Sequence, residues 1–551
     1  MTGVLARRDL AKAQTAADRA RHQITANDLD AAVSSARQVA DSARAAHRLT
    51  TGPAWWVAAH IPLLGRPAET ARGCAASADV LGRQVVLPLS IAGQALDPAR
   101  LISNGSVRLA PIIAAAPTLD KAKTVLARTS GEVAALPEQT WLSPVDRARD
   151  KYLQTLTTLS SQVTSIDRTV QILPSMLGRN GAKRYFVGLE NEAEARGLGG
   201  IPGAFAIVTA DNGRLSFERF ESDTTLYKVR TNLDLGPEYQ ARYGAAQPQN
   251  TYANSTISPD FSDAGRIWAA MWQRYSGEKV DGAIAVDPTA IAYLLKQTGP
   301  AALADGQQVS AGNVVALTQQ TLYARYPDTA RRKAYLIDIA SAISKRLITA
   351  HGTSGLLKAV QLAADQRRLM LWSADADAEN VLRRTSVSGT VDPGGDRFSG
   401  FTVSNAAGNK LDFYLHRSMS YTRAGCGSTA TTTATFTLRN AAPASGLPAY
   451  VTLRVDKPAY PTKPGDNKLL VNYYSTAGGR IFSVTVNGKP IEVNSGSEKG
   501  LSVFTIELEL PRGTTSTITV TSTDNSDSNR LQILRQPGVN PMPVTVRQPS
   551  C

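Results

Sequence analysis

The stretch Arg184–Gly213 contains the residues whose types and spacing best fit a functional site. Its polar and glycine members follow an apolar run, and the main ones are Glu190, Asn191, Glu192, Glu194, Arg196, Gly199 and Gly200. Arginine is a forked cation that suits phosphate oxygens, and glycines let a backbone approach a ligand closely. The spacing matches neither a P-loop nor the dinucleotide fingerprint. The pattern therefore predicts a binding site without fixing its chemistry.

Two other interpretations of this stretch stay open. Its acids could pair with Arg184 and Arg196 on a surface loop, while the glycines only turn the chain. Alternatively, Glu190, Glu192 and Glu194 stand on alternate residues of an extended segment and so share a face. Two carboxyl groups about 5–9 Å apart are what glycoside hydrolysis requires. A glycoside hydrolase is thus one candidate.

The elements that must position these residues read as a central α/β domain over residues 179–385. Residues 185–189 and 204–208 are apolar strands, and Asp211-Asn212-Gly213 is a hairpin signal. Val280–Val286 is a further strand, Asp287 caps the helix that follows, and Gly299-Pro300 stops that helix. We also expect helices over 310–323 and 331–348 and a strand over 369–372.

Residues 1–178 predict an α-helical stalk or bundle. Apolar residues recur at helical spacing from Leu5 to Arg48, with a break at 25–28 where Asn27 could cap the second helix. Ser143 is expected to cap a long helix. The pair Trp55-Trp56 either packs against the stalk or sits in the interfacial region of a membrane.

Residues 386–551 predict a C-terminal antiparallel β-sandwich, which makes the whole chain an α+β multidomain protein. Short alternating runs recur about every ten residues, among them FTVSN, KLDFYLH, YVTLRV and LLVNYYS. Cys426 lies in a turn of this domain and Cys551 ends a proline-rich tail. A disulfide between them would tie the tail down.

Composition limits the partners. The net charge of +14 suits nucleic acid, anionic lipid or an anionic polymer, but no long Lys/Arg run occurs, so no nucleic-acid partner is expected. Three cysteines and five scattered histidines lack the spacing of a zinc site. No window of 18 apolar residues is present.

The segment NEAEARGLGGIPGAFAIVTADNGRL resembles the central motif of an actinobacterial family, the domain-of-unknown-function 4012 family. The matching positions are Asn191, Glu192, Ala193, Glu194, Arg196, Gly199 and Gly200. The resemblance extends to PAWWVAAHIPLLGR and VDGAIAVDPTAIAYLLKQTGP. It implies an extracytoplasmic envelope protein that assembles or binds cell-wall or surface polysaccharide. Family members carry one membrane span before the helices, and this sequence begins where that span would end.

The run from Val280 to Tyr323, followed by Arg331-Arg332, is distantly similar to the LytR-CpsA-Psr envelope ligases. That resemblance implies a phosphotransferase acting on a polyprenyl-pyrophosphate-linked glycopolymer. Arg196, Asp223 and Arg331 would be catalytic, Arg332 would assist binding, and Mg²⁺ would be the cofactor. The arginine-rich first half of the ligase pattern is missing. Polysaccharide binding, glycopolymer transfer and glycoside hydrolysis are the three candidate functions.

Overall fold

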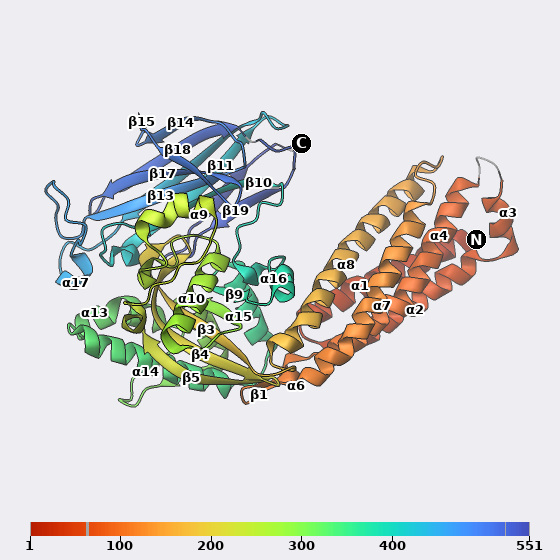
Figure 1. Ribbon diagram of the computed structural model, residues 1–551. Coiled ribbons are helices and arrows are strands. Elements are labelled where there is room, and N and C mark those ends of the chain that lie inside the picture. Colours follow the sequence, from red (N-terminus) through yellow and green to blue (C-terminus); the bar gives the residue numbers. More distant parts are fainter. Residues whose placement is uncertain (1, 62–64, 524, 550–551) are drawn as a thin grey trace. The chain divides into compact units, whose positions relative to one another are not determined.

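The computed structural model describes residues 2–61, 65–523 and 525–549 and shows a mixed α/β protein with several sheets (Figure 1). The chain divides into two compact units. The helical unit contains the residues up to Gly181, with the short segments Asp211–Arg214 and His351–Ser354. The second unit contains Ala182–Ala210, Leu215–Ala350 and the chain from Gly355 onward, so it includes both the predicted α/β domain and the predicted sandwich.

Long helices that run side by side make up the helical unit (Figure 1). The first hairpin packs through small side chains, because all the buried residues of α1 are alanines. Within the described residues, no helix has both the length and the apolar character needed to cross a bilayer. The helices are α1 (Thr2–Thr25), α2 (Leu29–Thr50), α3 (Pro53–Ala59), α4 (Arg66–Leu81), α5 (Leu87–Ala95), α6 (Pro98–Leu101), α7 (Leu109–Ala134) and α8 (Ser143–Met176).

Two helix starts differ from the sequence prediction. Asp28, not Asn27, caps α2, because its side chain accepts a hydrogen bond from the Ala31 N–H, while Asn27 has the left-handed φ of 62° that the turn requires. Ser143 is the first residue of α8 rather than its cap, and the capping position is taken by Leu142, whose side chain makes no cap hydrogen bond. Asp146, in the first turn of α8, accepts hydrogen bonds from the backbone N–H and the hydroxyl of Thr140. These bonds hold the loop before α8 against the start of the helix.

The second unit contains a mixed sheet in which β5, β4, β3, β6 and β9 are neighbours in that order. β3 pairs antiparallel with β4 and parallel with β6, and β6 pairs antiparallel with β9. The strands predicted around 185, 204, 280 and 369 are all present. Their bounds are β3 (Lys183–Arg196), β4 (Gly199–Asp211), β5 (Arg214–Ser222), β6 (Gly282–Val286) and β9 (Leu369–Ser373).

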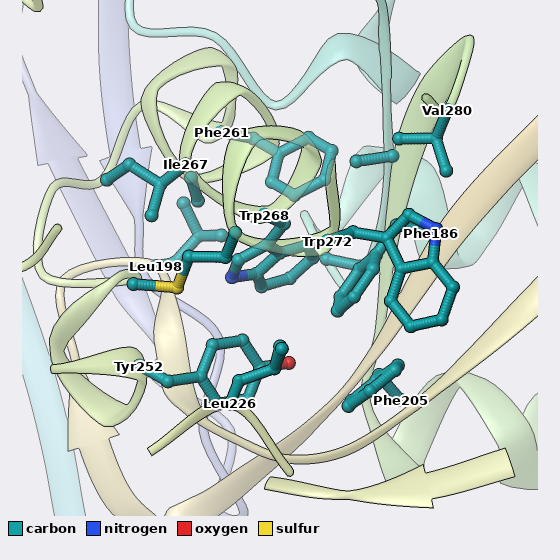
Figure 2. Close-up of a cluster of buried hydrophobic side chains, with 14 of the residues drawn as sticks. Phe186, Leu198, Phe205, Leu226, Tyr252, Phe261, Ile267, Trp268, Trp272 and Val280 are labelled. Atoms are coloured by element: carbon teal, nitrogen blue, oxygen red, sulfur yellow. The ribbon is translucent and has the colours of Figure 1, made fainter. Parts of the chain in front are cut away.

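An aromatic core packs on one face of this sheet (Figure 2). Trp268 on α10 (Phe261–Ser276) lies over Gly188 of β3, where a Cβ atom would come within 2.4 Å of the indole ring. Phe186 and Phe205 stack with their ring centroids 4.7 Å apart. The Trp268 Nε1 donates to the Ser255 hydroxyl, so the buried indole keeps a hydrogen-bond partner. This core fixes the position of β3, the strand that carries the motif.

Further helices surround the sheet. Asp287 caps α11 and Gly299 ends it, as the sequence predicts. The expected helix over 310–323 is shorter and irregular, whereas the one over 331–348 is present as α14. The bounds are α9 (Pro237–Tyr243), α10 (Phe261–Ser276), α11 (Pro288–Thr298), α12 (Val314–Ala316), α13 (Leu322–Arg325), α14 (Thr329–Ile348), α15 (Ser354–Asp365) and α16 (Ala376–Leu382).

Two sheets packed around a common apolar core form the sandwich. One has the order β16-β17-β13-β10-β19 and the other β15-β14-β18-β12-β11-β20. Most pairs are antiparallel, but β19 and β20 join parallel to β10 and β11. The bounds are β10 (Arg397–Asn405), β11 (Leu415–Ala424), β12 (Thr431–Asn440), β13 (Asn467–Ser475), β14 (Ile481–Val486), β15 (Lys489–Pro490), β16 (Asn494–Glu498), β17 (Leu501–Leu510), β18 (Thr515–Thr523), β19 (Leu531–Arg535) and β20 (Val544–Arg547).

Two of the predicted sandwich strands are wrong. KLDFYLH contains a 3-10 turn at Leu411–Tyr414 before β11 begins, because the buried Asp412 accepts hydrogen bonds from Ala195, Asn405 and Asn467. YVTLRV begins in the short helix α17 (Ala449–Thr452), which starts directly after Pro448.

Candidate functional site

Three neighbouring strands bring charged residues to the same end of the sheet, where β6 finishes and β9 begins. In the register of the sheet, Leu189 of β3 lies beside Val286 of β6, and Val286 lies beside Leu369 of β9. The residues next to these positions are Glu190, Asp287 and Arg368. Because the strands are hydrogen-bonded neighbours, these residues lie at the same end of the sheet, and Glu192, two residues beyond Glu190, reaches Arg368 there.

Glu192, Asp287 and Arg368 form a buried ionic cluster. The Arg368 Nη1 lies 2.8 Å from Glu192 Oε1 and 2.7 Å from Asp287 Oδ2. Gln319 donates to the other Glu192 oxygen at 2.6 Å, and Arg368 Nη2 donates to the Gly538 carbonyl at 2.9 Å. Burial, and then the nearby charge of Glu192, raise the pKa of Asp287 well above its usual range, and Arg368 only partly opposes this. Burial in the cluster therefore favours the protonated form of Asp287 relative to an exposed acid.

Glu190 is the second carboxyl group with altered acidity. Burial raises its pKa to about 8, the charge of Glu192 adds to the rise, and the Gly200 N–H and Arg367 oppose it. Its Oε1 has no hydrogen-bond partner among the described residues. Glu190 is therefore mainly protonated at pH 7, in contrast to a surface acid.

Glu194 belongs to a separate polar group on the sandwich side. Lys410 Nζ lies 2.5 Å from Glu194 Oε1, and the Asn191 amide donates to the same oxygen and to the Tyr323 hydroxyl. The Lys410 ammonium also lies 4.6 Å from the centroid of the Tyr450 ring. The motif thus bonds to side chains from both parts of the second unit.

A small cavity of about 170 Å³ opens beside this group. Polar and aromatic groups share its lining with apolar ones. The lining residues are Gln319, Gln320, Thr321, Tyr323, Ala324, Lys410, Tyr414, Gly446, Leu447, Pro448 and Val451. The Gln320 amide donates to the Tyr414 hydroxyl at 2.9 Å, which orients that ring.

Arg196 and the glycines of the motif make their contacts with other parts of the same chain. The Arg196 guanidinium donates to Asn254 Oδ1 and to the carbonyls of Ala195 and Asn405. A Cβ atom on Gly200 would lie 2.3 Å from the Asn191 carbonyl group, and one on Gly199 would lie 2.9 Å from Pro537. These glycines allow a close approach of the chain to itself, so their contacts are internal.

The three residues expected to be catalytic share no contact among the described residues. Asp223 pairs with Lys333 at 2.5 Å and accepts from the Tyr227 hydroxyl, while Arg196 has the partners given above. Arg331 is exposed and lies over the Tyr326 ring, 5.0 Å from its centroid. The neighbouring Arg332 is buried, donates to the Tyr326 carbonyl and stacks on Tyr450. The role that the ligase resemblance implies for these residues stays a prediction, because Tyr227, which bonds to Asp223, is also affected by the charge of Glu194.

Several residues of the site were not found from the sequence. Asp287 was identified only as a helix cap, and Arg368, Lys410 and Gln319 were not singled out. The one available signal was the pair Arg367-Arg368 directly before an apolar strand, a position where a buried arginine needs acids nearby. Their pairing with the motif depends on contacts between distant segments.

Two further expectations concern metal and disulfide chemistry. In the part of the chain that the structure describes, no group of three or more His, Cys, Asp or Glu side chains is placed to hold a metal ion. Asp223, the acid expected near Mg²⁺, is paired with Lys333 instead.

Cys74 carries a free thiol, and burial raises its pKa to about 11. Cys551 lies outside the described residues, so the Cys426–Cys551 disulfide stays a prediction.

Comparison with curated proteins and with solved structures finds no match for this chain. One family model does match, over residues 180–323. This segment begins just before β3, includes the whole glutamate, arginine and glycine motif, and ends at Tyr323, which bonds to Asn191. The matched family is described as "Protein of unknown function (DUF4012)", and residues 180–323 of this chain are similar to it.

Proposed function

We propose that this protein works in the cell envelope, outside the cytoplasm, and binds a cell-surface polysaccharide without catalysing a reaction. The observation that carries this proposal is the cavity of about 170 Å³ beside the motif. A cavity of about 150 Å³ is large enough for one six-membered aromatic ring. A sugar residue is bulkier than an aromatic ring, so the cavity of about 170 Å³ has room for part of one sugar residue, with the rest of the chain outside.

The lining suits a hydroxylated ring. Tyrosine rings can lie against the C–H face of a sugar, while amide, hydroxyl and ammonium groups exchange hydrogen bonds with its hydroxyls. Tyr323 and Tyr414 supply the first type of group, and Gln320 and Lys410 supply the second. Glu194 neutralises the Lys410 charge, so a neutral sugar residue fits this position better than a strongly anionic one. The net charge of +14 favours an anionic polymer overall.

The burial of the motif acids argues against the hydrolase alternative. Glycoside hydrolysis needs two carboxyl groups that can reach a sugar and a water molecule. The side chains of Glu192 and Asp287 are fully buried, and both pair with Arg368. Glu190 is also buried, with Gly199 and Pro537 beside it. Their contacts fit a role in joining the sheet to the sandwich.

Glycopolymer transfer, which the distant LytR-CpsA-Psr resemblance implies, is the weaker candidate. It needs cations and an aspartate around one pyrophosphate group. Arg196 is engaged with backbone and Asn254, and Asp223 is paired with Lys333. These residues would have to exchange their present partners before they could hold a shared ligand.

The proposal can be tested by isothermal titration with oligosaccharides from purified cell-wall polysaccharide. Ala324 lines the cavity and is exposed, so Ala324→Trp should fill its mouth without disturbing the core. We expect at least a tenfold loss of affinity. The matched control is Ala330→Trp, an exposed alanine on α14 that does not line the cavity. Equal affinity of the two variants would reject the cavity as the binding site. Recovery of the native protein in the cytosolic fraction of the cell would reject the proposed location outside the cytoplasm.

A further inference from the structure

One end of the helical unit exposes an unusual number of large apolar side chains. The helix α3 buries none of its residues, and Trp56 and Val57 on it are 55% and 56% exposed. Ile61, just beyond the helix, is also exposed. A surface helix of a globular protein normally turns an apolar stripe toward a core. The helix α3 instead presents its apolar side chains outward.

The loop between α7 and α8 adds a second tryptophan to the same end. Trp141 is 60% exposed and is followed by the exposed Leu142. The Thr70 hydroxyl lies 3.5 Å from the Pro137 carbonyl, and a Cβ on Gly73 would meet Leu136, so the start of α4 lies against this loop. In Figure 1 the loop and α3 are at one end of the bundle. We call Trp56, Val57, Ile61, Trp141 and Leu142 the apolar tip.

Local hydrogen bonds hold the apolar tip in place. Thr140 donates through its backbone N–H and its hydroxyl to Asp146, and the Leu142 N–H donates to the Thr140 hydroxyl. The Trp56 ring stacks on His60 with centroids 4.2 Å apart. The exposed tryptophans are therefore presented by a structured loop and helix.

Basic residues accompany the tip. The segments that form the tip and its surroundings, 2–8, 44–72 and 135–147, contain seven arginines (Arg7, Arg8, Arg44, Arg48, Arg66, Arg72 and Arg147) and three acids (Glu69, Glu138 and Asp146). Six of these arginines are exposed, and Arg72 is the exception. Tryptophan favours the boundary between lipid headgroups and acyl chains, and arginines are attracted to anionic headgroups. A protein partner with an apolar patch would match the tryptophans but would not account for the excess of arginine.

We propose that the apolar tip docks onto an anionic lipid surface, with Trp56 and Trp141 inserted at the headgroup boundary and the arginines on the headgroups. This mode is peripheral: the apolar side chains enter only the outer layer of the bilayer. It is independent of the sugar cavity, which lies in the second unit.

Flotation of the full chain with vesicles tests this proposal. The vesicles are equimolar phosphatidylcholine and phosphatidylglycerol, with phosphatidylcholine alone as the comparison. We expect binding to the mixed vesicles, weaker binding to the neutral ones, and a loss of about tenfold or more in the variant Trp56→Ser/Trp141→Ser. The matched control is Ile166→Ser, because Ile166 is 51% exposed on α8, roughly 35 Å along that helix from its first residue.

Three results would overturn the proposal. The native chain could fail to float with the mixed vesicles, or the double tryptophan variant could bind them as well as the Ile166→Ser control does. The third is self-association of the native chain that the double variant loses, without vesicle binding, since a second copy would then cover the tip. Circular dichroism of each variant shows whether the helices are retained, so a folding defect is recognised separately.

Discussion

Arg368 lies between Glu192 and Asp287, with its Nη1 atom 2.8 Å from one carboxylate and 2.7 Å from the other. The three residues come from β3, from the start of α11 and from the start of β9, and all three side chains are buried. Arg368 also donates to the Gly538 carbonyl, so it fastens the C-terminal segment to the sheet. One guanidinium thus joins four distant parts of the second unit.

Replacement of this arginine should be strongly destabilising. Arg368→Met removes the cation and leaves two buried carboxyl groups without it. The expected loss is about 3–5 kcal/mol in the free energy of unfolding, as for other buried pairs that lose one partner. Urea unfolding of the second unit, followed by the fluorescence of its buried tryptophans Trp268 and Trp272, measures it.

Two controls accompany Arg368→Met. Arg331→Met removes an exposed arginine and should change stability by no more than about 0.5 kcal/mol. The triple variant Glu192→Gln/Asp287→Asn/Arg368→Met removes all three charges and should be less destabilised than Arg368→Met alone. If the triple variant is less stable than Arg368→Met, the charge argument is wrong.

Glu190 should make stability fall as pH rises. Its pKa in the folded protein is about 8, above the ordinary value of 4.5, so the folded state keeps a proton that the unfolded state releases between these pH values. The contribution is fully present below about pH 4.5 and is lost progressively up to about pH 8. In this window the slope is about −1.4 kcal/mol per pH unit.

Glu190→Gln removes this slope, because glutamine resembles the protonated acid at every pH. Urea unfolding at several pH values from 5 to 8 should give a flatter profile for the variant than for the native chain. Asp287 also has a raised pKa and contributes in the same direction, so some slope remains. The exposed acid Glu278 supplies the control Glu278→Gln, whose profile should follow that of the native chain. Parallel profiles for native and Glu190→Gln would refute the shifted pKa.

The glycines of the motif should differ in their tolerance of alanine. A Cβ on Gly200 would lie 2.3 Å from the Asn191 carbonyl group, whereas one on Gly203 meets only ordinary contacts at 3.8 Å or more. Gly200→Ala should therefore cost about 1–3 kcal/mol or more, and Gly203→Ala should stay within about 0.5 kcal/mol of the native chain. Thermal unfolding of the two variants side by side checks this difference. A stable Gly200→Ala variant would mean that the turn can move away from Asn191.

The features that could be predicted from the sequence are those that depend on residues close together in the chain. The strands β3, β6 and β9 and the cap Asp287 follow from apolar runs and from capping chemistry within a few residues. The role of Arg368 could not be predicted, because it requires the register that places Leu369 beside Val286. The alternation of apolar and polar residues in KLDFYLH wrongly predicted a strand for a related reason. Asp412 is buried by bonds to Ala195 and to other distant residues, and no local pattern records those bonds.

Arg196 provides a test that separates a structural role from the role implied by the ligase resemblance. Its guanidinium makes four hydrogen bonds within the protein, to Asn254, Ala195 and Asn405. Lysine keeps the charge but cannot reproduce this planar set of donors. Arg196→Lys should therefore lower the free energy of unfolding by about 1–3 kcal/mol.

The matched substitution Arg331→Lys should leave stability unchanged, because Arg331 is exposed and is placed over only one tyrosine ring. Both variants are also assayed for binding of undecaprenyl pyrophosphate below their unfolding temperatures. If Arg196 is structural, the folded Arg196→Lys protein binds this lipid no differently from the native chain. An unchanged melting temperature combined with lost lipid binding would contradict that assignment, and it would restore Arg196 as a pyrophosphate ligand.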